Sequence, residues 1–168
     1  MKILVCIKQV PDNAVVPKLD PNTNRVTTDG VETMISPFDE NALEAALQIA
    51  ESNEGKVAVM TVGDDSCLTA LRKGLAMGAD EAYLVKDTAL EESDTWATSY
   101  VLAKAAAHCG GFDLILCGKQ AIDDDAAQVS SGIAEQLNIP QITYVEKINE
   151  ATAESITVQR VGSAGSEV

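Results

Sequence analysis

Residues 113–137 read DLILCGKQAIDDDAAQVSSGIAEQL, and this stretch decides the fold. It opens on a short apolar run, continues through a loop with one glycine and three consecutive aspartates, and ends in a segment with apolar residues at helical spacing. The apolar run is typical of a buried strand, and the period of the later segment is typical of a surface helix. The stretch therefore predicts a strand–loop–helix unit of an α/β fold.

The same alternation recurs along the chain. Apolar runs predict further strands at residues 3–10, 56–62 and 82–85, and segments of helical period lie between residues 36 and 55, 65 and 78, 93 and 111, and 125 and 140. Uninterrupted apolar runs suit strands that are covered on both faces. We expect a single α/β domain over residues 1–168, with an open, mostly parallel sheet, helices on both faces and a C-terminal strand pair.

Local signals place several boundaries. Ser36 is the expected N-cap of the first helix, with Pro37 at its first position and Asp39 facing back in a capping box. Residues 142–148 and 156–161 are expected to form the terminal strand pair, turning at Asn149 and Glu150. The connection over residues 11–35 is longer than α/β units need, and its segments 17–19 and 26–27 could pair as a small hairpin around a turn at residues 21–25.

The composition and the N-terminus exclude several classes of protein and of partner. The chain has 26 acidic and 12 basic residues, for a formal net charge of −14, so nucleic acid and anionic membranes are poor partners. The four cysteines, Cys6, Cys67, Cys109 and Cys117, form no C-x-x-C pair and are interpreted as reduced thiols. The N-terminus runs straight into a strand, without the pattern of a signal peptide or a membrane span, so we expect a cytoplasmic protein.

The loop after residue 117 is the expected ligand site. Ligands of open α/β sheets bind outside the carboxyl ends of the strands, where the direction of winding reverses. Gly118 allows close approach to the backbone, and the helix that follows would offer unpaired N–H groups to a phosphate. Two alternatives remain open for Asp123, Asp124 and Asp125: they could simply cap the helix, or, with weaker support, bind a metal.

Enzymatic signatures are absent from the sequence. Gly118-Lys119 is not part of a P-loop, because Asp113 stands where the upstream glycine is required. There is no G-x-G-x-x-G and no G-x-S-x-G, and the single histidine, His108, lies at the end of a helix. We therefore expect no catalytic residue in this chain. Because the support for a metal at the three aspartates is weak, we also expect no metal site.

Several blocks together resemble one known family. They are residues 1–12 (MKILVCIKQVPD), 36–39 (SPFD), 75–80 (LAMGAD), 94–99 (DTWATS) and 118–125 (GKQAIDDD). In this order and over nearly the whole chain, they resemble the small (beta) subunit of electron-transfer flavoproteins. The resemblance implies a strand order of 3-2-1-4-5 and a heterodimer with a large (alpha) subunit that carries a redox-active FAD.

The resemblance also implies a role in electron transfer. Electrons would arrive from an acyl-CoA-type dehydrogenase or from NADH and leave toward a quinone-linked or ferredoxin-linked acceptor. The small subunit of the family holds AMP or, in one subgroup, a second FAD. Carried over residue by residue, the cofactor-binding positions implied for this chain are Cys6, Ser36, Pro37, Phe38, Asp39, Val62, Gly118, Lys119, Gln120, Ala121, Ile122, Asp123, Asp124, Asp125, Ala126, Ala127, Gln128 and Val129.

These residues have distinct implied roles. Cys6 and Val62 would line the adenosine pocket, residues 118–123 would wrap the nucleoside, and residues 126–129 would offer N–H groups to phosphate together with the Gln128 amide. Phe38 would approach the partner's flavin, or else act as a staple on its own helix.

Two departures from the family pattern matter. Ala127-Gln128-Val129 replaces the Asn-Gln-Thr of AMP-binding members and favours the FAD-filled, electron-bifurcating subgroup, although Asp124 stands where that subgroup often has glycine. The family chain also continues well beyond residue 168, so this sequence is expected to be truncated. An alternative function is a stand-alone nucleotide-sensing module of the universal-stress type, although the glycine-rich loop it would need is absent. An adenylating or nucleotide-hydrolysing enzyme lacks its Ser-Gly-Gly-x-Asp-Ser run here.

Overall fold

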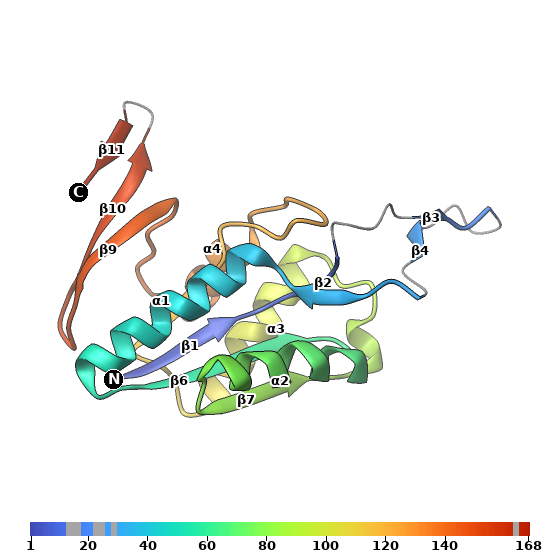
Figure 1. Ribbon diagram of the computed structural model, residues 1–168, viewed down its shortest axis with the longest axis horizontal. Helices are drawn as coiled ribbons and strands as arrows, with labels where there is room; N and C mark the ends of the chain where they lie inside the picture. Colours follow the sequence, from blue (N-terminus) through green and yellow to red (C-terminus); the bar gives the residue numbers. More distant parts are fainter. Residues whose placement is uncertain (13–17, 22–25, 28–29, 163–164) are drawn as a thin grey trace.

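The computed structural model describes residues 1–12, 18–21, 26–27, 30–162 and 165–168. Its centre is a four-stranded parallel sheet in the order β7-β6-β1-β8 (Figure 1). These strands are β1 (Lys2–Cys6), β6 (Lys56–Val62), β7 (Glu81–Val85) and β8 (Leu114–Cys117). This order confirms the predicted arrangement of the first four strands. No fifth strand joins this sheet within the described ranges.

Helices cover both faces of the sheet, as predicted (Figure 1). Successive residues of β1 point to opposite faces, so Ile3 and Val5 pack with one cluster of the core and Leu4 and Cys6 with the other. The first face carries α1 (Pro37–Asn53) and α2 (Leu68–Met77), and the second carries α3 (Thr95–His108) and α4 (Val129–Leu137). Two short 3-10 turns, η1 (Asp65–Cys67) and η2 (Thr88–Leu90), precede α2 and α3. No helix among the described residues is long and apolar enough to cross a bilayer.

The start of α1 differs from the predicted capping box. Ser36 precedes the helix and Pro37 occupies its first turn, but the Ser36 side chain makes no capping bond and its hydroxyl is buried without a partner among the described residues. The backbone N–H of Ser36 donates instead to the carbonyl of Lys8 at 2.9 Å. In a capping box, the carboxylate of Asp39 would accept this N–H. Because the N–H is already bonded to Lys8, the carboxylate turns toward the sheet instead.

The predicted first strand is split in two. β1 ends at Cys6, and Gln9–Pro11 forms a separate strand, β2, which pairs antiparallel with β5 (Thr33–Ile35). The break falls at Ile7 and Lys8, where the backbone leaves the parallel ladder and the N–H of Lys8 donates to a side chain. Farther along, β3 (Lys18–Leu19) pairs antiparallel with β4 (Val26–Thr27), as the hairpin prediction required. Pro17 and most of its predicted turn lie outside the described residues.

The C-terminal segment forms a small antiparallel sheet of its own. Its order is β11-β10-β9, with β9 at Val145–Ala151, β10 at Ile156–Gly162 and β11 at Gly165–Glu167, and it stands at one end of the molecule (Figure 1). The turn predicted at Asn149 and Glu150 is wrong, because β9 runs through both. The chain turns at Thr152–Ser155, where the Thr152 N–H donates to the Ser155 carbonyl at 2.8 Å.

Candidate functional site

The cleft at the carboxyl ends of β1 and β8 is where the fold places its switch point. The two strands are hydrogen-bonded neighbours, and Cys6 of β1 lies directly beside Cys117 of β8. Beyond them the chain departs toward α1 on one face and toward α4 on the other, so the two connections diverge. A cleft of about 330 Å³ opens between them. Its volume falls in the range of small-ligand pockets.

The floor of the cleft is formed by small side chains of the parallel strands, next to the carboxyl of Asp39. The side chains of Cys6, Thr61, Val62 and Cys117 line it. A hydrogen bond with Cys117, reinforced by burial, holds the pKa of the Cys6 thiol well above its ordinary value. Both effects keep that thiol protonated at neutral pH, so the floor suits a flat, neutral group such as an adenine ring.

Asp39 ties together the two segments that leave the sheet. Its Oδ2 accepts the N–H of Lys8 at 2.9 Å, and its Oδ1 accepts the N–H of Gly118 at 2.9 Å. Burial raises the pKa of this carboxyl to about 6, against the opposing effect of the two N–H donors. Gly118 is needed for this contact, since a Cβ there would lie 2.7 Å from the carbonyl carbon of Phe38.

Both lysines of the cleft are occupied by other groups. Lys8 Nζ lies 2.8 Å from Asp123 and 2.9 Å from Asp124. Burial lowers the pKa of Lys8, but these two carboxylates more than compensate and raise it overall. Lys119 Nζ lies over the ring of Tyr144, 5.1 Å from its centroid. A phosphate in the cleft would therefore depend on neutral N–H donors in addition to any cation.

The helix after β8 begins later than predicted. Its first residue is Val129, with Gln128 as the N-cap, so Asp123, Asp124 and Asp125 do not cap it. Two causes are visible: Lys8 holds the carboxylates of Asp123 and Asp124, and Asp124 also accepts the N–H of Ala126 at 3.1 Å. The backbone is left-handed at Asp125 and at Ala127, which prevents a helix before residue 128. The free N–H groups are therefore those of the first turn of α4, and not that of Ala126.

A third wall comes from α3, which sequence reasoning did not assign to the site. Asp94 is the N-cap of α3 and accepts the N–H of Ala97 at 2.8 Å, so this helix start is already occupied by a carboxylate. The start of α4 has no side-chain cap. Thr95 joins the two helices, because its hydroxyl donates to Oε1 of Gln128 at 2.7 Å. That bond leaves the NH₂ of Gln128 as the donor that could face a ligand.

The structure brings together most of the positions implied by the resemblance, and the rest lie outside the cleft. Those that line it are Cys6, Asp39, Val62, Gly118, Lys119, Gln120, Ala121, Asp124, Ala126, Ala127, Gln128 and Val129. Those that do not line it are Ser36, Pro37, Phe38, Ile122, Asp123 and Asp125. The lining residues that were missed include Lys8, Thr61, Leu90, Glu92, Ser93, Asp94, Thr95, Thr98, Cys117 and Ser130. The helix start at Ser93-Asp94 was the available signal, because it follows a strand whose carboxyl end lies at the same edge.

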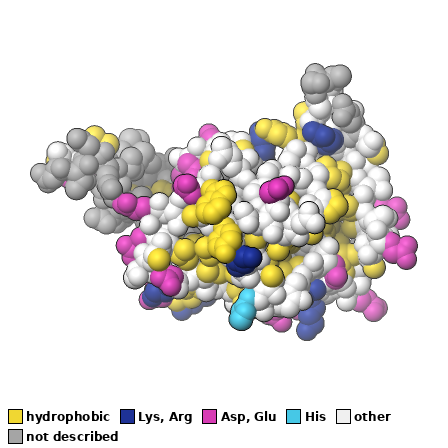
Figure 2. Space-filling model, turned by 180° about the vertical axis from the view of Figure 1, so that it is seen from behind, with side chains coloured by type: hydrophobic (Ala, Val, Ile, Leu, Met, Phe, Trp, Pro, Cys, Tyr) yellow, Lys and Arg dark blue, Asp and Glu magenta, His cyan; other side chains and the backbone are white. Residues whose placement is uncertain are grey.

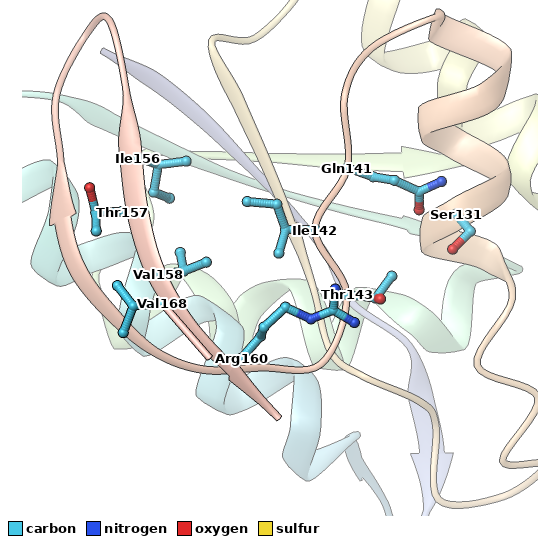
Figure 3. Close-up of a pocket in the computed structure, with 9 residues that line it drawn as sticks. All are labelled: Ser131, Gln141, Ile142, Thr143, Ile156, Thr157, Val158, Arg160 and Val168. Carbon is cyan, nitrogen blue, oxygen red and sulfur yellow. The ribbon is translucent and has the colours of Figure 1, made fainter. Parts of the chain in front are cut away.

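A second, larger cavity of about 610 Å³ lies beside the C-terminal sheet. Figure 3 shows Ile142, Val158 and Arg160 facing it, from the segment before β9 and from β10. The Nε of Arg160 is buried without a hydrogen-bond partner among the described residues. Because this cavity lies away from the carboxyl ends of the parallel strands, the rule that locates ligands in open sheets does not apply to it.

Comparison with known proteins identifies the family of the chain. A family model for the electron transfer flavoprotein domain matches residues 23–168. The chain belongs to the electron transfer flavoprotein family. It is 50% identical to the electron transfer flavoprotein subunit beta of Megasphaera elsdenii, over 98% of this chain and 63% of the relative. It is 48% identical to the subunit beta of Thermoanaerobacterium thermosaccharolyticum, over 100% of this chain and 64% of the relative.

A third relative carries a different name. The chain is 50% identical to the caffeyl-CoA reductase-Etf complex subunit CarD of Acetobacterium woodii, over 100% of this chain and 64% of the relative. The other two relatives are thus named as beta subunits of electron transfer flavoproteins, and this one as a subunit of a complex that contains an Etf. The chain spans slightly less than two thirds of the length of these relatives.

Proposed function

We propose that this chain is the nucleotide-holding part of an electron-transfer flavoprotein small subunit. It binds an adenine nucleotide in the cleft between β1 and β8 and, with a large subunit, helps to pass electrons from a dehydrogenase or NADH to a downstream acceptor. The cleft at the switch point, next to the uncapped start of α4, carries this proposal. The chain supplies binding and orientation, and it performs no reaction of its own.

The residues of the cleft fit the parts of such a nucleotide. The floor, where burial and a hydrogen bond keep the Cys6 thiol protonated, suits the adenine ring. The first turn of α4 offers N–H donors to a phosphate, and the positive end of the helix dipole favours the negative charge. Gln128 is held at this end by Thr95, which orients its amide.

FAD is the nucleotide that the loop favours, with AMP as the second candidate. Ala127 and Val129 offer no side-chain hydrogen bond, whereas AMP-binding members of the family have polar residues at both positions. A bound flavin would supply the redox chemistry, and this chain would hold its adenine end. The contents of the purified heterodimer decide: two FAD per heterodimer support our assignment, and one FAD with one AMP contradicts it.

The partners in electron transfer are proposed from the family and from relatives. The large subunit is the expected partner, since the relatives are named as one subunit of an electron transfer flavoprotein. An acyl-CoA-type dehydrogenase is the proposed electron donor, with NADH as an alternative. The name of the Acetobacterium woodii relative places that protein in a complex with a caffeyl-CoA reductase.

Exchange of Gln128 for alanine tests the phosphate site. A hydrogen bond to a charged group contributes about 1.5–3 kcal/mol, so we expect Gln128→Ala to weaken nucleotide binding roughly tenfold or more. The measurement is calorimetric titration of the nucleotide-stripped heterodimer with AMP, ADP and FAD.

Gln141→Ala is the matched control, because Gln141 is an exposed amide at the other cavity. Unchanged affinity in Gln128→Ala would contradict the proposed phosphate position. Tight binding of ATP by the isolated chain, without any large subunit, would favour the nucleotide-sensing alternative.

A further inference from the structure

The outward face of α3 carries two exposed aromatic side chains in a chain that has few. The whole sequence contains one Trp, three Tyr and two Phe. The single tryptophan, Trp96, is 65% exposed, and Tyr100, one turn farther along, is 40% exposed. A core this poor in aromatic residues would gain from burying both, so their position on the surface calls for a covering group.

The two rings form one platform. Their centroids lie 5.8 Å apart and their planes differ by 9°. Lys104, a further turn along, places its Nζ 5.2 Å from the centroid of the Tyr100 ring. His108 follows at the same spacing and is also exposed. These four residues, four positions apart, are called the α3 stripe.

Figure 2 shows the face of the molecule opposite to that of Figure 1. Hydrophobic side chains gather in its centre, above the single histidine of the chain, which is His108. Large exposed apolar groups in one place mark sites of interaction more often than scattered ones do. Trp and Tyr are also the residues that most often dominate the free energy of a protein–protein interface.

The charge of the stripe is opposite to that of the rest of the chain. The molecule carries a formal net charge of −14, yet the fourteen residues of α3 include no Asp or Glu, one Lys and one His. A surface with no acidic residue at its centre and one cation, Lys104, toward one end suits a partner surface that is apolar and carries a carboxylate at its rim. The same net charge on two copies of this chain works against their association through this face.

The stripe begins at the rim of the nucleotide cleft. Thr95, the residue before Trp96, lines the cleft and bonds to Gln128. A protein that covers Trp96 therefore lies beside the bound nucleotide. Under the proposed function, electrons pass between the two subunits through bound nucleotide cofactors, so this continuity favours the large subunit over a partner that docks elsewhere.

We propose that the α3 stripe is a docking surface for the large subunit, which meets Trp96 and Tyr100 with an apolar patch and Lys104 with a carboxylate. The inference rests on the proposed function, because it assumes that a large subunit is present. Covering the exposed 65% of Trp96 and 40% of Tyr100 removes roughly 160–260 Å² from water, or about a quarter of the about 800 Å² that each side of a standard interface buries.

The single tryptophan makes the test direct. The chain is labelled with 5-fluorotryptophan, so that Trp96 gives the one ¹⁹F signal, and unlabelled large subunit is added. We expect the signal to shift and to lose its sensitivity to exchange of H₂O for D₂O. The dissociation constant should rise at least tenfold in Trp96→Ala, rise in Lys104→Glu, and change least in Trp96→Phe.

Two controls lie on α2, which covers the other face of the sheet. Leu75→Ala removes a hydrophobic side chain that is 41% exposed, and Arg72→Glu changes the net charge as Lys104→Glu does. Neither should alter the dissociation constant. Far-UV circular dichroism and the unfolding midpoint of each variant verify that the fold is retained.

The outcomes separate this inference from the proposed function. If the large subunit binds but the ¹⁹F signal does not shift, and Trp96→Ala binds as tightly as the wild type, the docking proposal is wrong and the proposed function stands. A signal that shifts with the concentration of this chain, without any large subunit, assigns the surface to a second copy and also overturns it. Failure of the wild-type chain to bind the large subunit at all contradicts the proposed function.

Discussion

At the scale of single residues, Asp39 is the group on which the shape of the cleft depends. It is 7% exposed, and its two oxygens accept the backbone N–H groups of Lys8 and Gly118. These donors belong to segments that are far apart in sequence and leave neighbouring strands in different directions. One buried carboxylate therefore fixes the separation of both rims of the cleft.

The buried carboxylate should leave a signature in the pH dependence of stability. Its pKa in the folded protein is about 6, above the 3.8 of a free aspartate, so the folded state binds the proton more tightly than the unfolded state. The stabilising contribution is complete below about pH 4 and is lost as the pH rises through 6. A shift of about two units corresponds to roughly 3 kcal/mol.

Asp39→Asn removes this titration and provides the comparison. We expect the free energy of unfolding of the wild type, relative to Asp39→Asn, to fall by up to about 3 kcal/mol between pH 4 and pH 7. Urea unfolding at a series of pH values measures it. The pKa of Lys8 is raised from 10.5 and that of Asp124 is lowered from 3.8, so neither group accounts for a change between pH 4 and pH 7. If the difference in the free energy of unfolding between the two proteins stays constant across this range, ionising Asp39 costs no more in the folded protein than in the unfolded chain.

At the scale of elements, the packing of α3 against α4 sets the wall of the cleft that sequence reasoning missed. Gly132 of α4 lies against Ser99 of α3, which is 1% exposed. A Cβ on Gly132 would lie 2.6 Å from the Cβ of Ser99. The two helices can approach this closely only because one of them lacks a side chain at the crossing.

This close approach makes a specific prediction for Gly132→Ala. Overpacking costs about 1–3 kcal/mol, and the better helix propensity of alanine returns about 1 kcal/mol, so the variant should be less stable by up to about 2 kcal/mol. In a Ser99→Gly background the clash is gone, and Gly132→Ala should be neutral or stabilising. Urea unfolding of the four proteins gives the coupling. If the effects of Gly132→Ala and Ser99→Gly on the free energy of unfolding simply add, the two helices can move apart at no cost in stability.

Strands and helices with a periodic apolar pattern were predictable from the sequence. Features that depend on contacts between residues far apart in the sequence were not. Apolar runs and helix periods located β1, β6, β7, β8 and the four helices, because burial on both sheet faces imposes those patterns. The start of α4 was predicted too early, since the pairing of Asp123 and Asp124 with Lys8 crosses more than a hundred residues. The capping box at Ser36 failed for the same reason: Asp39 bonds to Lys8 and Gly118 instead.

The site was predictable to a similar extent. The loop after β8 was identified from its glycine and from the switch-point rule, and many of its residues line the cleft. The contribution of α3 was missed because Asp94 and Thr95 resemble any helix start, and only the crossing of the helices brings Thr95 to Gln128.

At the scale of the whole molecule, the size of the cleft suits only part of a dinucleotide. Its volume of about 330 Å³ lies at the low end of ligand pockets, which suits an adenosine and leaves an isoalloxazine ring uncovered. We therefore expect the isolated 168-residue chain to purify without a stoichiometric flavin and to show no turnover. The absorption spectrum of the monomeric fraction measures this, and a full equivalent of flavin would contradict it.

The position of β1 in the middle of the sheet constrains the order of events during synthesis. One of its neighbours, β8, lies 111 residues later in the sequence. The hydrogen bond from the N–H of Lys2 to Asp113 spans the same separation. At about 5–20 residues per second, the ribosome needs roughly 6–20 s to deliver that neighbour. Throughout that interval one edge of this buried strand lacks its partner. Within the parallel sheet, β1 is thus translated before the other strands and gains its second neighbour only when β8 arrives, so we expect that edge to be open to aggregation until then.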